Sequence, residues 1–381
     1  MGDSRDTFHD SRDTFYMAQA LQLARRGWYT TQPNPRVGCV LVRDGEVVGE
    51  GWHQWAGQAH AEVNALAQAG SKARGATAYV TLEPCNHQGR TPPCVQALID
   101  AGVARVVVAM RDPHVGAAGG WEALQAAGIQ VDGSPLAEDA RALNAGFIKR
   151  CETGLPRVVL KLASSLDGRT AMASGESKWI TGAAARSDVQ RLRAQSGAII
   201  TGVGTVLKDN PALTVRAAQL GSDVDDATRI AAHQPLRVIV DSHCRVAAQA
   251  QSLQIFQPPG QVLIATAIAV EPIAGAETLV VANTVGKVDL RALLQELARR
   301  ECNDVLVEAG AKLAGVFLQE GLVDELVVYL APKLLGSNAR PLALLPLDAM
   351  AQALDLCITD IRAVGGDWRI TASVVAGTGE N

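Results

Sequence analysis

The feature that most constrains this chain is a set of four residues combining zinc ligands with a carboxylate. His60 and Glu62 flank one alanine, Cys85 follows a proline, and Cys94 comes after eight intervening residues, 86–93. One imidazole and two thiolates can hold zinc and leave its fourth position open for water. We expect Glu62 to move a proton between that water and a departing amine rather than bind the metal. The pattern therefore predicts a catalytic zinc centre.

A closed, structural zinc site is the alternative, and it would need a fourth ligand. His87 is the one candidate, but its place between the two cysteines favours a position facing the substrate. The remaining cysteines are expected to be ordinary buried or free thiols: Cys39, Cys151, Cys244, Cys302 and Cys357.

Length and composition set the outer limits. A chain of 381 residues favours two domains, and 48% hydrophobic residues supply material for two cores. The net charge of −4, with no basic run, argues against nucleic acid as a partner. No apolar stretch approaches about 18 residues and no signal peptide is visible, so we expect a cytoplasmic protein that does not enter a membrane.

Helix and strand patterns alternate through residues 14–150. Asp44-Gly45 lies between two apolar runs, which predicts a two-residue hairpin turn. His60 and Cys94 each open a predicted helix, where the helix dipole favours a thiolate. The expected helices are 14–26, 60–69, 94–101, 121–127 and 136–150, and the expected strands are 37–42, 47–51, 76–82, 103–110 and 129–131.

The first residues contain a short duplication. Residues 3–8 recur as residues 10–15. We expect no function for the repeat, and we expect its first copy to be frayed.

A domain boundary is predicted within 151–156, giving domains 1–152 and 153–381. The second half alternates β-type and helical runs, which favours an α/β domain with a largely parallel sheet. Residues 217–234 are polar and are expected to form a surface loop. The expected strands are 157–163, 198–203, 236–241, 261–266, 278–282, 304–308, 325–331 and 368–375, with helices at 182–196, 289–300 and 311–320.

Two glycine-containing turns in this half are candidate nucleotide sites. Gly202-Val203-Gly204 follows an apolar strand, but Leu207 replaces the third glycine of a dinucleotide fingerprint, so a Rossmann domain is the weaker interpretation. In 305–315 a strand ends in a glycine turn that opens a helix, whose free N–H groups can bind phosphate. Glycine is common in such turns, so an ordinary structural turn stays open as the alternative.

The motifs of the first half resemble the deaminase half of the bifunctional deaminase/reductase of riboflavin biosynthesis. The long Gly- and Pro-containing segment between the two cysteines is typical of that family and is absent from cytidine and tRNA-adenosine deaminases. The motifs are Pro33-Asn34-Pro35-Arg36-Val37-Gly38, Gly51-Trp52-His53, His60-Ala61-Glu62, Thr81-Leu82-Glu83-Pro84-Cys85 and Gly89-Arg90-Thr91-Pro92-Pro93-Cys94.

The resemblance implies a cytidine-deaminase-like α/β/α domain that binds zinc through His60, Cys85 and Cys94. Its substrate would be 2,5-diamino-6-(5-phosphoribosylamino)pyrimidin-4-one, which loses its 2-amino group. The resemblance also places Asn34 and His53 at the substrate and Arg90 at its phosphoribosyl end. A turn role for Asn34 and a solvated loop charge for Arg90 stay open.

One segment departs from the family pattern. Related chains often read Asp-Pro-Asn-Pro where this one reads Asp112-Pro113-His114-Val115, and the segment is shortened. The departure concerns one wall of the pocket and leaves the metal chemistry unchanged.

The second half resembles the reductase half of the same family. The resemblance implies a dihydrofolate-reductase-like α/β fold and hydride transfer from NADPH to the ribose C1′ of the deaminated product. The matching segments are 161–169, 177–181, 192–194, 202–206, 209–211, 213–216 and 308–310.

Residue roles follow from that resemblance. Arginines suit a phosphate-bearing substrate, because their forked donors match phosphate oxygens. The implied cofactor contacts are Ala163, Trp179, Thr205, Asp209, Gly310, Ala311, Lys312, Leu313, Ala314, Gly315 and Val316. The implied substrate contacts are Ser177, Arg193, Leu213, Arg216 and Glu308.

Three residues are candidates for proton handling at the opening ribose: Lys161, Asp209 and Glu308. A capping role before Pro211 is the alternative for Asp209. The preference for NADPH over NADH is implied by the family alone.

The leading hypothesis is a bifunctional enzyme acting on a small phosphoribosylated pyrimidine, with a homodimer favoured. One rival is a zinc-stabilised binding module fused to a pyridine-nucleotide sensor, which would have no use for Glu62. Another is a nucleic-acid-editing deaminase, against which the absent basic patch and the long 86–93 segment both count.

Overall fold

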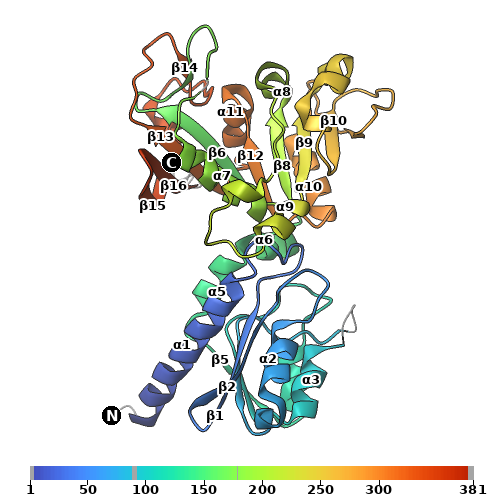
Figure 1. Cartoon of the computed structure of the whole chain (residues 1–381), viewed down its shortest axis with the longest axis vertical. Helices are drawn as coiled ribbons and strands as arrows, with labels where there is room; N and C mark the ends of the chain where they lie inside the picture. Colours follow the sequence, from blue (N-terminus) through green and yellow to red (C-terminus); the bar gives the residue numbers. More distant parts are fainter. Residues whose placement is uncertain (1–3, 88–91, 178, 376–381) are drawn as a thin grey trace. The chain divides into compact units, whose positions relative to one another are not determined.

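The computed structural model describes residues 4–87, 92–177 and 179–375. The chain forms two compact units, Met1–Gly154 and Leu155–Asn381 (Figure 1). Within the described part of the chain, no helix has the length and hydropathy needed to span a membrane.

A five-stranded sheet with the order β2-β1-β3-β4-β5 forms the centre of the N-terminal unit. β1 (Gly38–Arg43) pairs antiparallel with β2 (Glu46–Trp52) and with β3 (Thr77–Val80). β3, β4 (Arg105–Val108) and β5 (Gln130–Gly133) run parallel. The last residues of these parallel strands therefore reach the same edge of the sheet.

Helices cover both faces of this sheet, because successive strand residues point to opposite sides. On the face that carries Leu41, the packed helices are α2 (Ala61–Ala69), α3 (Cys94–Ala101) and α4 (Gly120–Ala126). On the face that carries Val40, they are α1 (Ser4–Arg25), α5 (Ala137–Leu143) and α6 (Ala145–Thr153). The unit is a three-layer α/β/α domain, as predicted.

The C-terminal unit contains a nine-stranded sheet with the order β11-β10-β9-β8-β12-β6-β13-β16-β15. Neighbouring strands from β11 to β13 are parallel, and β16 pairs antiparallel with both β13 and β15. The largely parallel sheet is confirmed. The strands are β6 (Arg157–Ser165), β8 (Ala198–Gly202), β9 (Leu236–Val240), β10 (Val262–Thr266), β11 (Glu277–Val280), β12 (Asp304–Glu308), β13 (Glu325–Ala331), β15 (Leu356–Val364) and β16 (Asp367–Val374).

Both faces of this larger sheet are also covered. α10 (Leu290–Arg299) and α11 (Ala311–Gln319) pack on the face that carries Leu160. α7 (Ala183–Gln195), α8 (Val203–Asp209) and a 3-10 helix (Arg245–Ser252) pack on the opposite face. A separate two-stranded sheet joins β7 (Arg169–Ala171) to β14 (Arg340–Pro341).

The predicted hairpin is confirmed at Asp44 and Gly45. Their φ angles of 54° and 83° are the positive values that a two-residue turn between antiparallel strands requires. Asp44 tolerates this conformation better than most residues with a side chain, and Gly45 adopts it without strain.

Several other predictions were wrong. The described residues of the first copy, 4–8, are helical rather than frayed, because α1 begins at Ser4 and continues through the second copy. The helix expected at 136–150 is two helices, α5 and α6. They are separated at Asn144, whose side chain accepts from the Arg36 backbone N–H at 2.8 Å and donates to its carbonyl at 2.9 Å.

The polar segment 217–234 is not a plain loop. It contains a short 3-10 helix (Ala217–Gln219) and α9 (Ala227–Ala232), with Ile230 buried. Other elements were not predicted: β7, α8, β14, β15 and the 3-10 helices Gly70–Ala73, Arg245–Ser252, Gln254–Phe256 and Met350–Gln352.

One contact ties α1 to the sheet and should stabilise the N-terminal unit. Asp13 accepts two hydrogen bonds from Arg105, at 2.9 and 2.7 Å, and one from the Tyr79 hydroxyl at 2.8 Å. Asp13→Asn removes the charge, so we expect a loss of about 1.5–3 kcal/mol, the range for a hydrogen bond to a charged group. Calorimetry should show a lower melting temperature for this unit only. Exposed Arg12 is the matched control, and an equal shift for Arg12→Gln would contradict the role of Asp13.

Candidate active sites

Three metal-ligating side chains converge in the N-terminal unit. His60 directly precedes α2, Cys94 is the first residue of α3, and Cys85 follows β3. His60 Nδ1 lies 3.5 Å from Cys85 Sγ and 3.3 Å from Cys94 Sγ. Tetrahedral zinc, with bonds of about 2.0 Å to nitrogen and 2.3 Å to sulfur, separates such atoms by about 3.5 Å. The donor set therefore fits zinc in both chemistry and spacing.

The environment of the two cysteines favours a thiolate. Hydrogen bonding from the Cys94 side chain, and then from His60, lowers the pKa of Cys85 to about 4. The Cys94 backbone N–H also points to Cys85 Sγ, at 3.4 Å. The same coupling to Cys85 raises the pKa of Cys94. These contacts favour the thiolate form of Cys85, which is the form that binds zinc.

Glu62 is buried in the first turn of α2, with 3% of its surface exposed. Burial, followed by the nearby charge of Cys85, raises its pKa to about 7. A carboxyl group with that pKa can both accept and release a proton near neutral pH. The burial and pKa of Glu62 thus suit proton transfer.

A histidine and an asparagine form a second polar layer beside the ligands. His53 Nδ1 lies 3.1 Å from the Ala59 carbonyl, which only an N–H can satisfy, so the ring donates there. His53 Nε2 is then free to accept from Asn34 Nδ2 at 3.0 Å. Burial lowers the pKa of His53, consistent with this neutral form. The ring lies edge-on to His60, with centroids 5.4 Å apart.

A half-buried ionic cluster lies on two neighbouring strands in the C-terminal unit, with Lys161 in the middle of β6 and Glu308 as the last residue of β12. Lys161 on β6 and Glu308 on β12 are partners in the parallel register. Arg193 on α7 donates to both Glu308 oxygens, at 2.6 and 3.0 Å, and to the Thr214 carbonyl at 3.0 Å. These contacts join three elements around one carboxylate.

Burial has opposite consequences for the two partners in this cluster. Burial alone would raise the pKa of Glu308, but the charge and hydrogen bonds of Arg193, together with the charge of Lys161, bring it below its usual value. Burial, and then the Arg193 charge, lower the pKa of Lys161. Glu308 is thus held ionised, while Lys161 releases its proton more readily than an exposed lysine.

Comparisons with known proteins decide the family. Residues 156–370 match the RibD C-terminal domain, and residues 10–110 match the cytidine and deoxycytidylate deaminase zinc-binding region. The riboflavin biosynthesis protein RibD of Escherichia coli is 53% identical over 365 residues, which are 93% of this chain and 98% of that protein. The chain belongs to the RibD family.

Solved structures agree over nearly the whole length. RibD of Acinetobacter baumannii, form 1, is 47% identical, with a TM-score of 0.89 over 96% of this chain and 99% of that one. A diaminohydroxyphosphoribosylaminopyrimidine deaminase/5-amino-6-(5-phosphoribosylamino)uracil reductase of Thermotoga maritima is 31% identical, with a TM-score of 0.84 over 96% of this chain and all of that one.

As a RibD protein, the chain is a bifunctional deaminase and reductase of riboflavin biosynthesis. Its N-terminal domain has the cytidine-deaminase-like fold and its C-terminal domain the reductase fold that resembles dihydrofolate reductase. The cofactors are zinc and NADPH. The fold, function and cofactor predictions are confirmed at this level, and the individual residue roles stay predictions.

The closed-zinc alternative finds no support in the described residues. There, the potential metal ligands that lie together number three, His60, Cys85 and Cys94. The His87 side chain is exposed. Arg90, predicted to contact the phosphoribosyl end, lies outside the described residues.

The predicted cofactor residues gather mainly at two helix starts. Gly310 directly precedes α11, and a Cβ placed on it would lie 3.8 Å from Thr205 Oγ1 on α8. Ala314 and Gly315 are buried on α11, whereas Val316 is partly exposed. Trp179 is 65% exposed, and its ring lies beside Arg186 at 4.5 Å.

The other predicted contacts vary in burial. Leu213 is buried with a positive φ of 49°, Ala163 and Ser177 are half-buried, and Arg216 is exposed. The capping alternative for Asp209 is not supported. Asn210 ends α8 in the left-handed conformation, and the Asp209 side chain makes no hydrogen bond to the described residues.

The sequence analysis missed contacts made by residues 110–121. Ala117 is buried against Cys85 and Cys94, and its carbonyl accepts from the Asn86 N–H at 3.1 Å. Glu83 was quoted only as part of a motif, yet its carboxylate binds this segment. The sole sequence signal was the proximity of Glu83 to Cys85.

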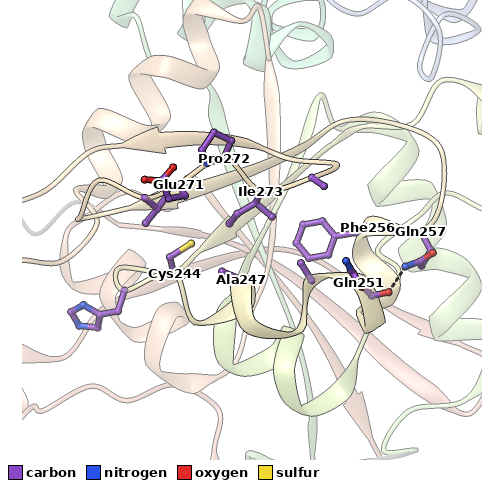
Figure 2. A pocket seen from close by; sticks show the side chains of 12 residues that line it. Cys244, Ala247, Gln251, Phe256, Gln257, Glu271, Pro272 and Ile273 are labelled. Atoms are coloured by element: carbon purple, nitrogen blue, oxygen red, sulfur yellow. Dashed lines mark hydrogen bonds between the residues drawn. The ribbon is translucent and has the colours of Figure 1, made fainter.

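A separate cavity of about 620 Å³ lies in the C-terminal unit between the 3-10 helices after β9 and the loop after β10 (Figure 2). Phe256, Ile273 and Cys244 line it together with polar Gln251 and Glu271. None of the predicted site residues is among its described lining residues, so it does not bear on the two sites above.

The zinc ligands can be tested by metal content. We expect one zinc ion per chain in the wild-type protein and a strongly reduced content in Cys85→Ser and Cys94→Ser, since either change leaves only two strong ligands. Inductively coupled plasma mass spectrometry measures this. Cys357→Ser is the matched control because Cys357 is exposed in the other unit. Full zinc loading of both ligand variants would show that zinc binds elsewhere.

Proposed function

We propose that the N-terminal domain, 1–152, deaminates 2,5-diamino-6-(5-phosphoribosylamino)pyrimidin-4-one. In the domain 153–381, we propose, the ribosyl group of the product is then reduced to a ribityl chain. The observation that carries the first step is the three-ligand group with buried Glu62 two residues beyond His60. The second step is supported by the Lys161–Glu308–Arg193 cluster, which joins β6, β12 and α7 of a reductase domain.

Zinc held by His60, Cys85 and Cys94 supplies the Lewis acidity that activates water. Glu62 takes the proton of the attacking water and delivers it to the leaving amine at the pyrimidine C2. Burial raises the pKa of Glu62 to about 7, which supports this role. A carboxyl group with that pKa can take up a proton near neutral pH and release it again. Hydrolysis replaces the C2–N bond by a C2–O bond and releases ammonia.

Asn34 and His53 bind the pyrimidine in this proposal. The acceptor nitrogen of His53, Nε2, accepts a hydrogen bond from the Asn34 side-chain NH₂ group and so orients the amide. The Asn34 side-chain oxygen then points away from the imidazole and can accept from a substrate N–H group. Arg90 contacts the phosphoribosyl end.

NADPH supplies the hydride for the second step. Opening the ribose breaks its C1′–O4′ bond, so the ring oxygen gains a proton while C1′ gains the hydride. Lys161 is proposed as the proton donor, because it is a half-buried cation whose lowered pKa eases proton release. Glu308 holds the charge of Lys161 and orients it, and Asp209 is left as a cofactor contact.

The binding contacts of the reductase site follow the same proposal. Arg193 uses three N–H donors on Glu308 and Thr214, which leaves two for the substrate. Arg216, Ser177 and Leu213 complete the substrate contacts. Ala163, Trp179, Thr205 and residues 310–316 contact NADPH, with the start of α11 offering backbone N–H groups to phosphate.

A cytoplasmic homodimer is proposed as the working form. Its support is β15, an edge strand of the large sheet that is exposed along nearly its whole length and carries Leu356, Ile358 and Ile361 at 45–55% exposure. Exposed apolar edge strands are usually covered by another chain. Sedimentation velocity of the wild-type protein measures the state directly.

Glu62→Gln should separate the two activities. The amide keeps the size of the side chain but cannot take up a proton, so ammonia release should fall by about 10²–10⁴-fold. Reduction of the supplied deaminated intermediate and the zinc content should stay at wild-type levels. Glu46→Gln, at an exposed position beside the hairpin, is the control. If both activities fell together in a folded protein, independent sites would be wrong.

Lys161→Met should give the opposite result: reduction should fall strongly and deamination should stay unchanged. The pH profile provides a second readout. A proton donor loses activity as the pH rises through its pKa, and burial lowers the pKa of Lys161. Wild-type reduction should therefore decline below the usual lysine value of about 10.4. Exposed Lys287→Met is the control. A normal reduction rate in Lys161→Met would transfer the proton role to another group.

A further inference from the structure

Glu83 binds a distant segment through four donors. Its carboxylate accepts from the backbone N–H groups of Asp112 at 3.1 Å, Gly119 at 3.1 Å and Trp121 at 3.0 Å, and from the Arg111 guanidinium at 3.5 Å. The Glu83 backbone N–H also donates to the Met110 carbonyl at 2.9 Å. Only 3% of Glu83 is exposed. A buried carboxylate needs such donors to replace the water molecules that it loses on burial. These hydrogen bonds are therefore required for Glu83 to be buried in its charged form.

The bound segment forms a wall of the zinc site. Ala117 packs against Cys85 and Cys94, and its carbonyl accepts from the Asn86 N–H. The start of α4 is pressed against the Cys85 segment as well, since a Cβ on Gly120 would lie 1.9 Å from the Pro84 carbonyl oxygen. The wall therefore packs against the Cys85 segment with no room for a side chain at position 120.

Glu83 joins that wall to the segment after β3 that carries the metal ligand Cys85. One residue, Pro84, separates Glu83 from Cys85, and the three amides lie on both sides of Ala117 in the chain. Residues 112–119 thus form a loop whose two ends close on one carboxylate. The Glu83 carboxylate is thus the point at which both ends of this loop are held.

We propose that Glu83 is a positioning residue of the deaminase site, which holds residues 112–121 against the Cys85 segment and so sets the wall that faces the substrate. Glu83 touches neither substrate nor metal and acts through the loop. The inference rests on the proposed deamination.

Glu83→Gln tests this proposal. The glutamine amide keeps the shape of the side chain, but its NH₂ group is a donor and cannot accept the hydrogen bonds that the backbone N–H groups donate. Mutation of residues that orient metal ligands without binding the metal themselves typically lowers metal affinity or activity by about 10–100-fold. We expect ammonia release per bound zinc to fall within that range, with reduction unchanged. Hydrogen exchange measured by mass spectrometry should become faster in the peptide spanning 110–121, in zinc-loaded and zinc-free protein alike.

Glu122→Gln is the matched control. Glu122 is the exposed partner of Arg111, at 2.8 Å, and is bound to the same loop without contacting the three amides. This variant should keep wild-type deamination and hydrogen exchange. Equal losses in both variants would overturn the proposal.

The other outcomes are also decisive. Wild-type activity per bound zinc in Glu83→Gln, or unchanged exchange in 110–121, would refute the positioning role while leaving the proposed function intact. A wild-type protein that releases no ammonia would instead refute the proposed function, and the positioning role with it. If Glu83→Gln fails to load zinc, Gly120→Ala decides, since its Cβ displaces the wall and leaves Glu83 charged; normal deamination there would overturn the proposal.

Discussion

Parallel strands deliver their last residues to one edge of a sheet, and the zinc ligand Cys85 and the carboxylate Glu308 of this protein lie at or just beyond such strand ends. β3 continues into Glu83 and Cys85, and β6 and β12 bring Lys161 and Glu308 side by side. Helices begin at the same edge, which places His60 and Cys94 before or at the first residue of α2 and α3. A helix start offers unpaired N–H groups and a positive dipole end, so anionic groups gather there at low cost.

Burial of charged groups at these sheet edges has an energetic cost. An ionised group removed from water must be compensated by specific partners, and each site contains such a set. Glu83 has three backbone amides, Glu308 has the Arg193 fork, and the Cys85 thiolate has His60 and Cys94. The partners come from segments far apart in the chain, so compensation of charge also fixes how those segments pack. Zinc completes this balance in the N-terminal domain.

The sequence predicted what depends on neighbouring residues. Asp44-Gly45 specifies its turn locally, and the helix starts at His60 and Cys94 follow from patterns a few residues long. The break at Asn144 could not be predicted this way, because it depends on Arg36, 108 residues away. The hydrogen bond between Glu83 and Gly119 joins residues 36 positions apart, and the bond between Asp13 and Arg105 joins residues 92 positions apart. Such contacts exist only once the sheet has brought distant segments together.

Two carboxylates in this protein show how environment assigns chemistry to the same group. Glu62 is buried beside a thiolate, so its charged form is disfavoured and its pKa rises to about 7. Glu308 is buried too, but Arg193 and Lys161 favour its charged form and lower its pKa. The first is suited to exchange protons at neutral pH, whereas the second stays ionised and can only orient cations. The charges that neighbour each glutamate therefore determine which protonation state it favours. The division of labour between the domains therefore follows from which charges surround each carboxylate, since glutamate is present in both.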